Sequence, residues 1–178
     1  MAFFQRLAGA LFLRAATFEE IEHDPTATTQ AAFVVILASV AQALRWLPES
    51  GVHAVVIGTA WALMSWSVWA ALLWVIGTHL MPESATEADV WQLLRTMGFA
   101  AAPGVLGVVT VFVPAAANTL TIVVGIWILF ATVLAVRQAL DYKSTLHAMV
   151  ACLIALAIII GLSIAAGYVL GHGVQPVS

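Results

Sequence analysis

Residues 94–104 read LRTMGFAAAPG, in which an arginine and a proline stand on either side of a run of small and apolar residues. Arg95 lies where an apolar helix would leave the membrane, so its guanidinium can reach lipid phosphate or a carboxylate from a neighbouring loop. Pro103 lies about two turns deeper, removes one N–H donor and frees a carbonyl near residue 99. The small residues around it let another helix approach closely. The stretch therefore predicts a kinked, tightly packed membrane span.

The composition of the whole chain agrees with this interpretation. Of the 178 residues, 63% are hydrophobic and 8% are charged, whereas a soluble domain carries about 25% charged residues. The apolar residues are spread along nearly the whole chain, so residues 1–178 are predicted to form a single membrane domain. The net charge of −3 argues against a nucleic-acid partner.

Helix start and stop signals divide this domain into an all-α, five-helix integral membrane bundle. The predicted spans cover about residues 26–47, 52–80, 95–113, 119–137 and 146–170. Asp24 followed by proline is typical of a helix start, and it precedes the first of these spans. Residues 1–23 carry apolar side chains on one helical face and are predicted to form an amphipathic helix in the membrane interface, with its arginines reaching headgroups.

The basic residues predict the orientation of the bundle. Five of the six fall on the N-terminal side of the spans: Arg6, Arg14, Arg95, Arg137 and Lys143. Only Arg45 lies near the other face. Because cytoplasmic loops carry an excess of lysine and arginine, the N-terminus is predicted to be cytoplasmic and the C-terminus to lie across a cell (inner) membrane.

Most carboxylates lie on the same side as these basic residues, and together they form a candidate polar cluster at the cytoplasmic face. Its members are Glu19, Glu20, Glu22, Asp24, Arg95, Arg137 and Asp141. The hypothesis is that the acidic side chains pair with the arginines and tie the N-terminal helix to the third and fourth spans. Arg95 in particular is predicted to pair with a carboxylate. The alternatives are a solvated acidic face and an arginine that only anchors to lipid headgroups.

No catalytic or metal site is predicted. The five histidines lack the i, i+4 spacing of a helical metal pair, and there is no nucleophile beside a base and no phosphate loop. The sequence therefore predicts a protein that is not an enzyme and has no cofactor.

Four tryptophans in the second span are assigned to packing or lipid contact rather than to a ligand site: Trp61, Trp66, Trp69 and Trp74. Small residues repeat along the fifth span, which is compatible with a homo-oligomer.

Four short motifs resemble the Yip family of Ypt/Rab-interacting membrane proteins, in particular its bacterial branch. GFAAAP (residues 98–103) is similar to the family's glycine, aromatic, three-residue and proline motif, which assigns Gly98, Phe99 and Pro103 a structural role. FEEIEHDPTATTQA, IGTHLMP and AVRQALDY occur in the family's order. The resemblance implies five spans and a cytoplasmic N-terminus. The eukaryotic Asp-Leu-Tyr-Gly-Pro motif is absent, so GTPase binding is not carried over to this chain.

These observations favour a multi-pass membrane scaffold or adaptor that organises the bilayer or partner proteins. Its expected partners are membrane lipid and an unidentified membrane or cytoplasmic protein. The alternative is a small channel or transporter whose third span is broken at Pro103. Against that alternative, the interiors of the predicted spans contain no Asp, Glu, Lys or Arg.

Overall fold

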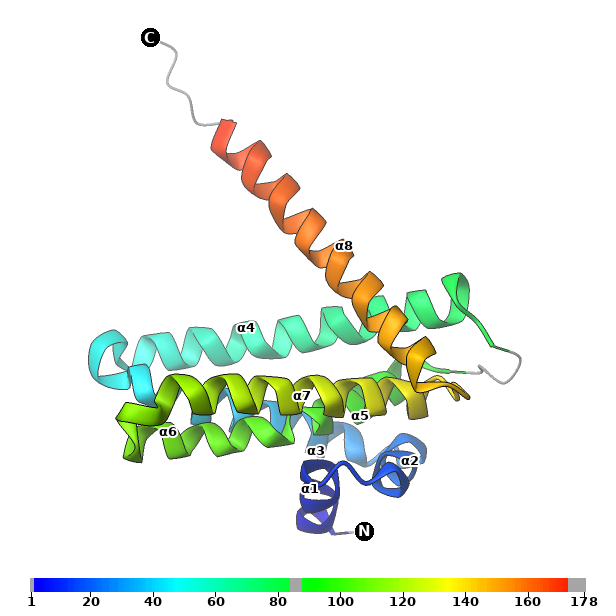
Figure 1. Cartoon of the computed structure of the whole chain (residues 1–178), viewed down its shortest axis with the longest axis horizontal. Helices are drawn as coiled ribbons and strands as arrows, with labels where there is room; N and C mark the ends of the chain where they lie inside the picture. The colour runs from blue at the N-terminus through cyan, green and yellow to red at the C-terminus, as the bar shows by residue number, and fades with distance from the viewer. Residues whose placement is uncertain (1, 84–87, 173–178) are drawn as a thin grey trace.

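The computed structural model describes residues 2–83 and 88–172, and every regular element within those ranges is a helix (Figure 1). This confirms the predicted all-α class. The long elements are α3 (Ala27–Ala43), α4 (Leu47–Val75), α5 (Val90–Ala100), α7 (Ala117–Ala139) and α8 (Thr145–His172). A π-helical turn, η2 (Ile76–Leu80), extends α4, and the 3₁₀ helix η3 (Ala102–Val108) and the short α6 (Val109–Phe112) extend α5.

Within the described residues, four continuous helical stretches are long and apolar enough to cross a membrane: Ala27–Leu80, Val90–Phe112, Pro114–Ala139 and Thr145–Ala165. The first has 54 residues, far more than the roughly 20 that one crossing needs. It reverses at Gly51, whose φ of 68° an L side chain rarely adopts. The Ser39 hydroxyl donates to Thr59 Oγ1 across the resulting pair, at 3.2 Å. This stretch therefore supplies two antiparallel spans, α3 and α4 (Figure 1), and the chain is a multi-pass membrane protein.

The prediction of one helix over residues 1–23 is wrong, because the structure has two. They are α1 (Phe3–Leu11) and α2 (Ala15–His23), which we call the N-terminal cap. Leu13 breaks the helix with a φ of 55°, and the two helices then pack so closely that a Cβ on Gly9 would lie 2.2 Å from Thr17 Oγ1. The cap packs on the bundle near the start of α5, and Phe18 and Ile21 are fully buried there.

The third span changes from an α-helix to a 3₁₀ helix just before Pro103. The α-helix ends at Ala100, and the chain continues as the 3₁₀ helix η3 before it becomes α-helical again. The glycines beside the proline lie against α3. A Cβ on Gly98 would be 2.6 Å from Ala31 Cβ, and one on Gly104 would be 2.9 Å from Ala38 Cβ. The break is therefore a site of close helix packing.

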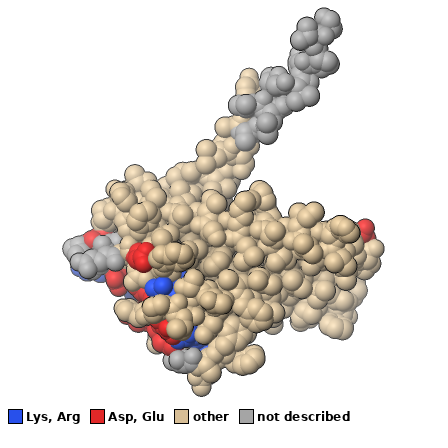
Figure 2. All heavy atoms as spheres, turned by 180° about the vertical axis from the view of Figure 1, so that it is seen from behind, with Lys and Arg blue, Asp and Glu red and all other residues tan. Residues whose placement is uncertain are grey.

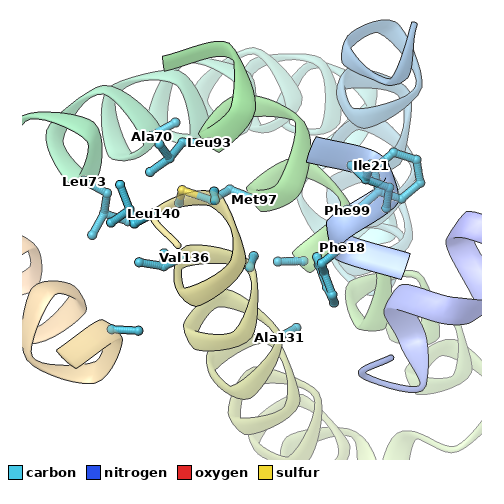
Figure 3. Packing of buried hydrophobic residues seen from close by; sticks show 14 of the residues in the cluster. Phe18, Ile21, Ala70, Leu73, Leu93, Met97, Phe99, Ala131, Val136 and Leu140 are labelled. Atoms are coloured by element: carbon cyan, nitrogen blue, oxygen red, sulfur yellow. The ribbon is translucent and has the colours of Figure 1, made fainter. Parts of the chain in front are cut away.

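The buried core joins the cap to the spans. Figure 3 shows Phe18 and Phe99 on one side of α7 and Leu73 with Leu140 on the other. Only the first part of α8 packs on the bundle, and the helix then diverges from it (Figure 1). The α8 residues that the structure describes as fully buried are alanines: Ala148, Ala151 and Ala155.

Charged side chains gather at one end of the molecule. Figure 2 shows acidic and basic residues around the cap and the neighbouring loops, while most of the long sides of the bundle carry uncharged residues. Large apolar side chains are exposed along these sides, among them Trp61, Ile122 and Leu153. Exposed apolar side chains of this number are expected where lipid is the solvent.

Candidate functional site at the charged end

Arg6 of α1 organises the acidic segment that precedes the first span. Its Nε and Nη2 donate to Glu20 Oε1 at 3.1 and 2.7 Å, and its Nη1 donates to Gln30 Oε1 at 3.1 Å. Nη2 also forms an ion pair with Asp24. The side chain of Arg6 is only 2% exposed. One guanidinium therefore links α1, α2 and the first turn of α3, through the charge-assisted bonds that arginine makes best.

The arginine stabilises the charged form of both carboxylates. Burial, the largest single effect, raises the pKa of Glu20, but favourable hydrogen bonds and charge interactions, those of Arg6 first among them, together lower that pKa overall. Hydrogen bonds from the Thr26 hydroxyl and from Arg6 hold the pKa of Asp24 well below its usual range. Both carboxylates are therefore anionic at neutral pH, and both pair with the Arg6 guanidinium within the cap.

Sequence reasoning did not include Arg6 in the polar cluster, because an arginine on an amphipathic helix was expected to reach lipid headgroups. The signal that could have found it is the charge balance of the segment. Residues 19–24 contain four carboxylates, and such a group needs a cation when it is packed against protein. Arg6 and Arg14 are the nearest arginines along the chain. In the structure, Arg6 pairs with two of the four carboxylates.

Arg95 of α5 holds the end of α2, but not through a carboxylate. Its Nε and Nη2 donate to the backbone carbonyl of Glu22 at 3.1 and 2.6 Å. Arg95 is 8% exposed. The last carbonyls of a helix have no partner inside the helix, and a cation near them interacts favourably with the helix dipole. The predicted tie between the cap and the third span thus exists, but the predicted carboxylate partner of Arg95 is wrong.

The side chain of Glu22 is buried beside this contact. It is 2% exposed, and its Oε1 accepts a hydrogen bond from Gln92 Nε2 at 3.2 Å. Its other oxygen, Oε2, is buried without a hydrogen-bond partner. Burial, reinforced by the nearby charge of Asp141, raises the pKa of Glu22 to about 7. This carboxyl group is therefore close to half protonated at neutral pH, unlike Glu20 and Asp24.

Two of the remaining predicted members, Arg137 and Asp141, lie at the end of α7. Arg137 donates to the carbonyls of Tyr142 and Lys143 at 3.3 and 3.4 Å, so it closes the turn into α8 rather than pairing with the acidic segment. Glu19 Oε2 instead accepts from Gln138 Nε2 at 2.7 Å, which ties α2 to α7. Asp141 is exposed and adopts a φ of 51°. The cluster is thus one region of the molecule with separate contacts, and not a single ion-pair network.

A further set of contacts, which sequence reasoning missed, joins the end of α4 to the turn between α7 and α8. The Tyr142 hydroxyl donates to the carbonyl of Met81 at 2.9 Å. His147 Nδ1 lies 3.2 Å from Glu83 Oε1. Within the described ranges, no group of three or more His, Cys, Asp or Glu side chains is arranged to hold a metal ion. The polar side chains of this end therefore connect helices to one another.

The tryptophans of α4 contribute to the same assembly. Trp66 Nε1 donates to the carbonyl of Leu94 at 3.1 Å, and Trp74 Nε1 donates to the carbonyl of Ala88 at 3.0 Å. Both bonds join α4 to the start of the third span. Together with the contacts of Arg6, Arg95 and Gln138, they attach the loops and the cap of the charged end to all neighbouring spans.

Comparison with known proteins agrees with this architecture. No curated protein and no solved structure matches the chain. The family model of the Yip1 domain matches residues 8–166, a range that begins in α1 and ends within α8. It includes α2, the Gly98–Pro103 motif and Arg95, whereas Arg6 lies just before it. The chain therefore belongs to the family of Yip1-domain membrane proteins.

Proposed function

We propose that the protein is a scaffold or adaptor of the Yip type in a cell inner membrane, where it organises the bilayer or partner proteins and turns over no substrate. The N-terminal cap faces the cytoplasm and the C-terminus lies on the opposite side, in the orientation that the distribution of basic residues favours.

The observation that carries this proposal is the fixed position of the cap. Arg6 joins α1 to α2 and α3, Arg95 holds the end of α2, and Gln138 holds Glu19. A surface that is already ordered before binding loses little conformational entropy when a partner binds. Glu19, His23 and Asp141 are exposed on this surface. A partner with a basic segment would be complementary to its two carboxylates.

Transport is the weaker candidate because the broken third span is filled by packing. A transporter with a broken helix uses the freed backbone to line a cavity for substrate or ions. Here Pro103 and Gly104 are buried, and Gly104 lies against Ala38 of α3. The backbone around the proline thus lies against another helix.

Photo-crosslinking in native membranes tests the proposal. A photoreactive amino acid at His23 reports on the cap, and one at Ile122, which is exposed on the side of α7, is the matched control. A scaffold should give discrete protein adducts at His23 and mainly lipid adducts at Ile122. Arg6→Ala should remove the His23 adducts and leave those at Ile122 unchanged. Lipid adducts alone at both positions would contradict the proposal, as would substrate or ion flux through the reconstituted protein.

A further inference from the structure

A polar pocket lies at the end of the bundle opposite the charged cap. It has a volume of about 160 Å³ and is lined by residues of α3, η3, α6, α7 and the 3₁₀ turn Leu44–Trp46. Arg45 provides its charge. Arg45 Nη2 donates to Asn118 Oδ1 at 3.0 Å, and its guanidinium carbon lies 4.4 Å from the centre of the Trp46 ring. A guanidinium and an indole at a membrane interface are the groups that meet lipid headgroups.

The charge of Arg45 is not balanced by the protein. Its two hydrogen-bond partners, Asn118 and Thr121, are neutral, and no ion pair within residues 2–83 and 88–172 includes it. Arg6, by contrast, forms ion pairs with two carboxylates. A guanidinium has five N–H donors in a fork that matches phosphate, and Arg45 uses only two of its nitrogens within the protein. The pocket therefore offers a cation and free donors to an anionic ligand.

A second, apolar groove lies between the spans. Its volume is about 380 Å³, and its walls come from α3, α4, α5 and α7. Gln42 lines both the pocket and the groove, so the two spaces share this residue as a wall. Leu129 at the rim is 65% exposed whereas Ala38 is 3% exposed, which places Ala38 at the floor of a groove that opens sideways.

The length and chemistry of the groove fit one acyl chain. Lining residues of the pocket and groove follow one face of α7 from Thr121 to Thr132, a distance of about 16 Å along a helix. One leaflet contributes about half of the ~30 Å hydrocarbon core. Several polar groups in the walls are satisfied internally: Ser39 and Thr132 donate to backbone carbonyls one turn earlier, and Trp66 donates to Leu94. These groups therefore do not require a polar ligand in the groove.

We propose that this pocket and groove form a binding site for one anionic phospholipid of the leaflet opposite the charged cap. The headgroup phosphate accepts hydrogen bonds from Arg45 and lies beside Trp46. One acyl chain extends along α7, between α3 and α4, towards Thr132. The inference is independent of the scaffold proposal, because it concerns the other end of the bundle.

Native mass spectrometry and photo-crosslinking test this site. The full chain is reconstituted with phosphatidylglycerol that carries a photoreactive acyl chain, in a background of phosphatidylcholine. One tightly retained phosphatidylglycerol is expected, with adducts concentrated on groove residues such as Ile128 and Leu129. Arg45→Gln should weaken retention about tenfold or more, and Arg45→Lys should weaken it less because the charge remains. Arg14→Gln, which removes an exposed arginine at the other end, should leave it unchanged.

A second variant keeps the test valid if Arg45→Gln is poorly folded. Ala62 lines the groove but not the pocket, so Ala62→Leu should reduce the groove adducts while the thermal stability stays near that of the parent. Excess inorganic phosphate, which supplies the headgroup chemistry without a chain, should not displace the lipid. Equal retention by the parent and Arg45→Gln would overturn the proposal. So would displacement by phosphate, or adducts spread evenly over the lipid-facing helices.

Discussion

Replacing the buried carboxyl group of Glu22 should change how the stability of the protein depends on pH. The pKa of Glu22 rises from 4.5 to about 7 on folding, mainly through burial. Each unit of such a shift corresponds to about 1.4 kcal/mol, so the folded state gains up to about 3 kcal/mol from keeping this group protonated. Because the folded state binds the proton more tightly than the unfolded chain, the gain is complete below about pH 4.5 and is lost as the pH rises through 7.

Glu22→Gln imitates the protonated form, so this variant should lose that part of the pH dependence. The assay is thermal unfolding of the detergent-purified protein between pH 5 and pH 8. The parent should lose several degrees more than the variant over this range, since about 1 kcal/mol corresponds to roughly 2–4 °C for a chain of this size. Glu49→Gln, which changes an exposed carboxylate at the other end of the bundle, is the control and should keep the parental slope.

Several other polar and charged groups lie around Glu22, and they also affect how stability depends on pH. Gln92 and Arg95 face it from α5, Asp141 faces it from the turn after α7, and Glu19 and His23 lie on its own helix. A hydrogen bond to the Glu19 carbonyl raises the pKa of His23, so His23 also stabilises the folded state at lower pH. His23 is present in both proteins, so its own contribution largely cancels when the pH dependence of the parent is compared with that of Glu22→Gln. If both lose the same stability between pH 5 and pH 8, the assignment to Glu22 is refuted.

Three further expectations follow from the packing. Arg6→Ala leaves two carboxylates of the cap without their cation and should destabilise the protein by about 2–4 kcal/mol, measured by thermal unfolding with Arg14→Ala as the control. Gly98→Ala places a methyl group 2.6 Å from Ala31 Cβ and should lower the yield of folded protein, while the double variant with Ala31→Gly should recover much of it; no recovery would disprove the direct contact. Cysteines that replace Ser50 and Ser144 should be labelled from outside intact cells only at position 50, and the reverse pattern would invert the orientation.

The sequence by itself determined the class of the protein. A chain with this apolar content must satisfy its backbone hydrogen bonds inside each segment when it enters lipid, which makes helices the outcome. Spacing of proline, glycine and capping residues then predicted where each span begins and ends, and α7 and α8 lie close to the predicted fourth and fifth spans. The glycine–proline motif of residues 98–103 also predicted close packing, and α3 does lie against Gly98. These features depend on local chemistry along one segment at a time.

Tertiary structure decided which partner each long polar side chain binds. Arg6 and Arg95 have similar sequence signals, since both lie where an apolar helix meets a charged segment, yet one contacts two carboxylates and the other a backbone carbonyl. In the packed structure the Glu22 carbonyl accepts both hydrogen bonds from Arg95, and the Glu22 carboxyl group accepts from Gln92. A guanidinium bonds to whichever acceptor lies within about 3 Å in the right direction. That distance depends on how helices pack against one another, and packing is a property of several segments together.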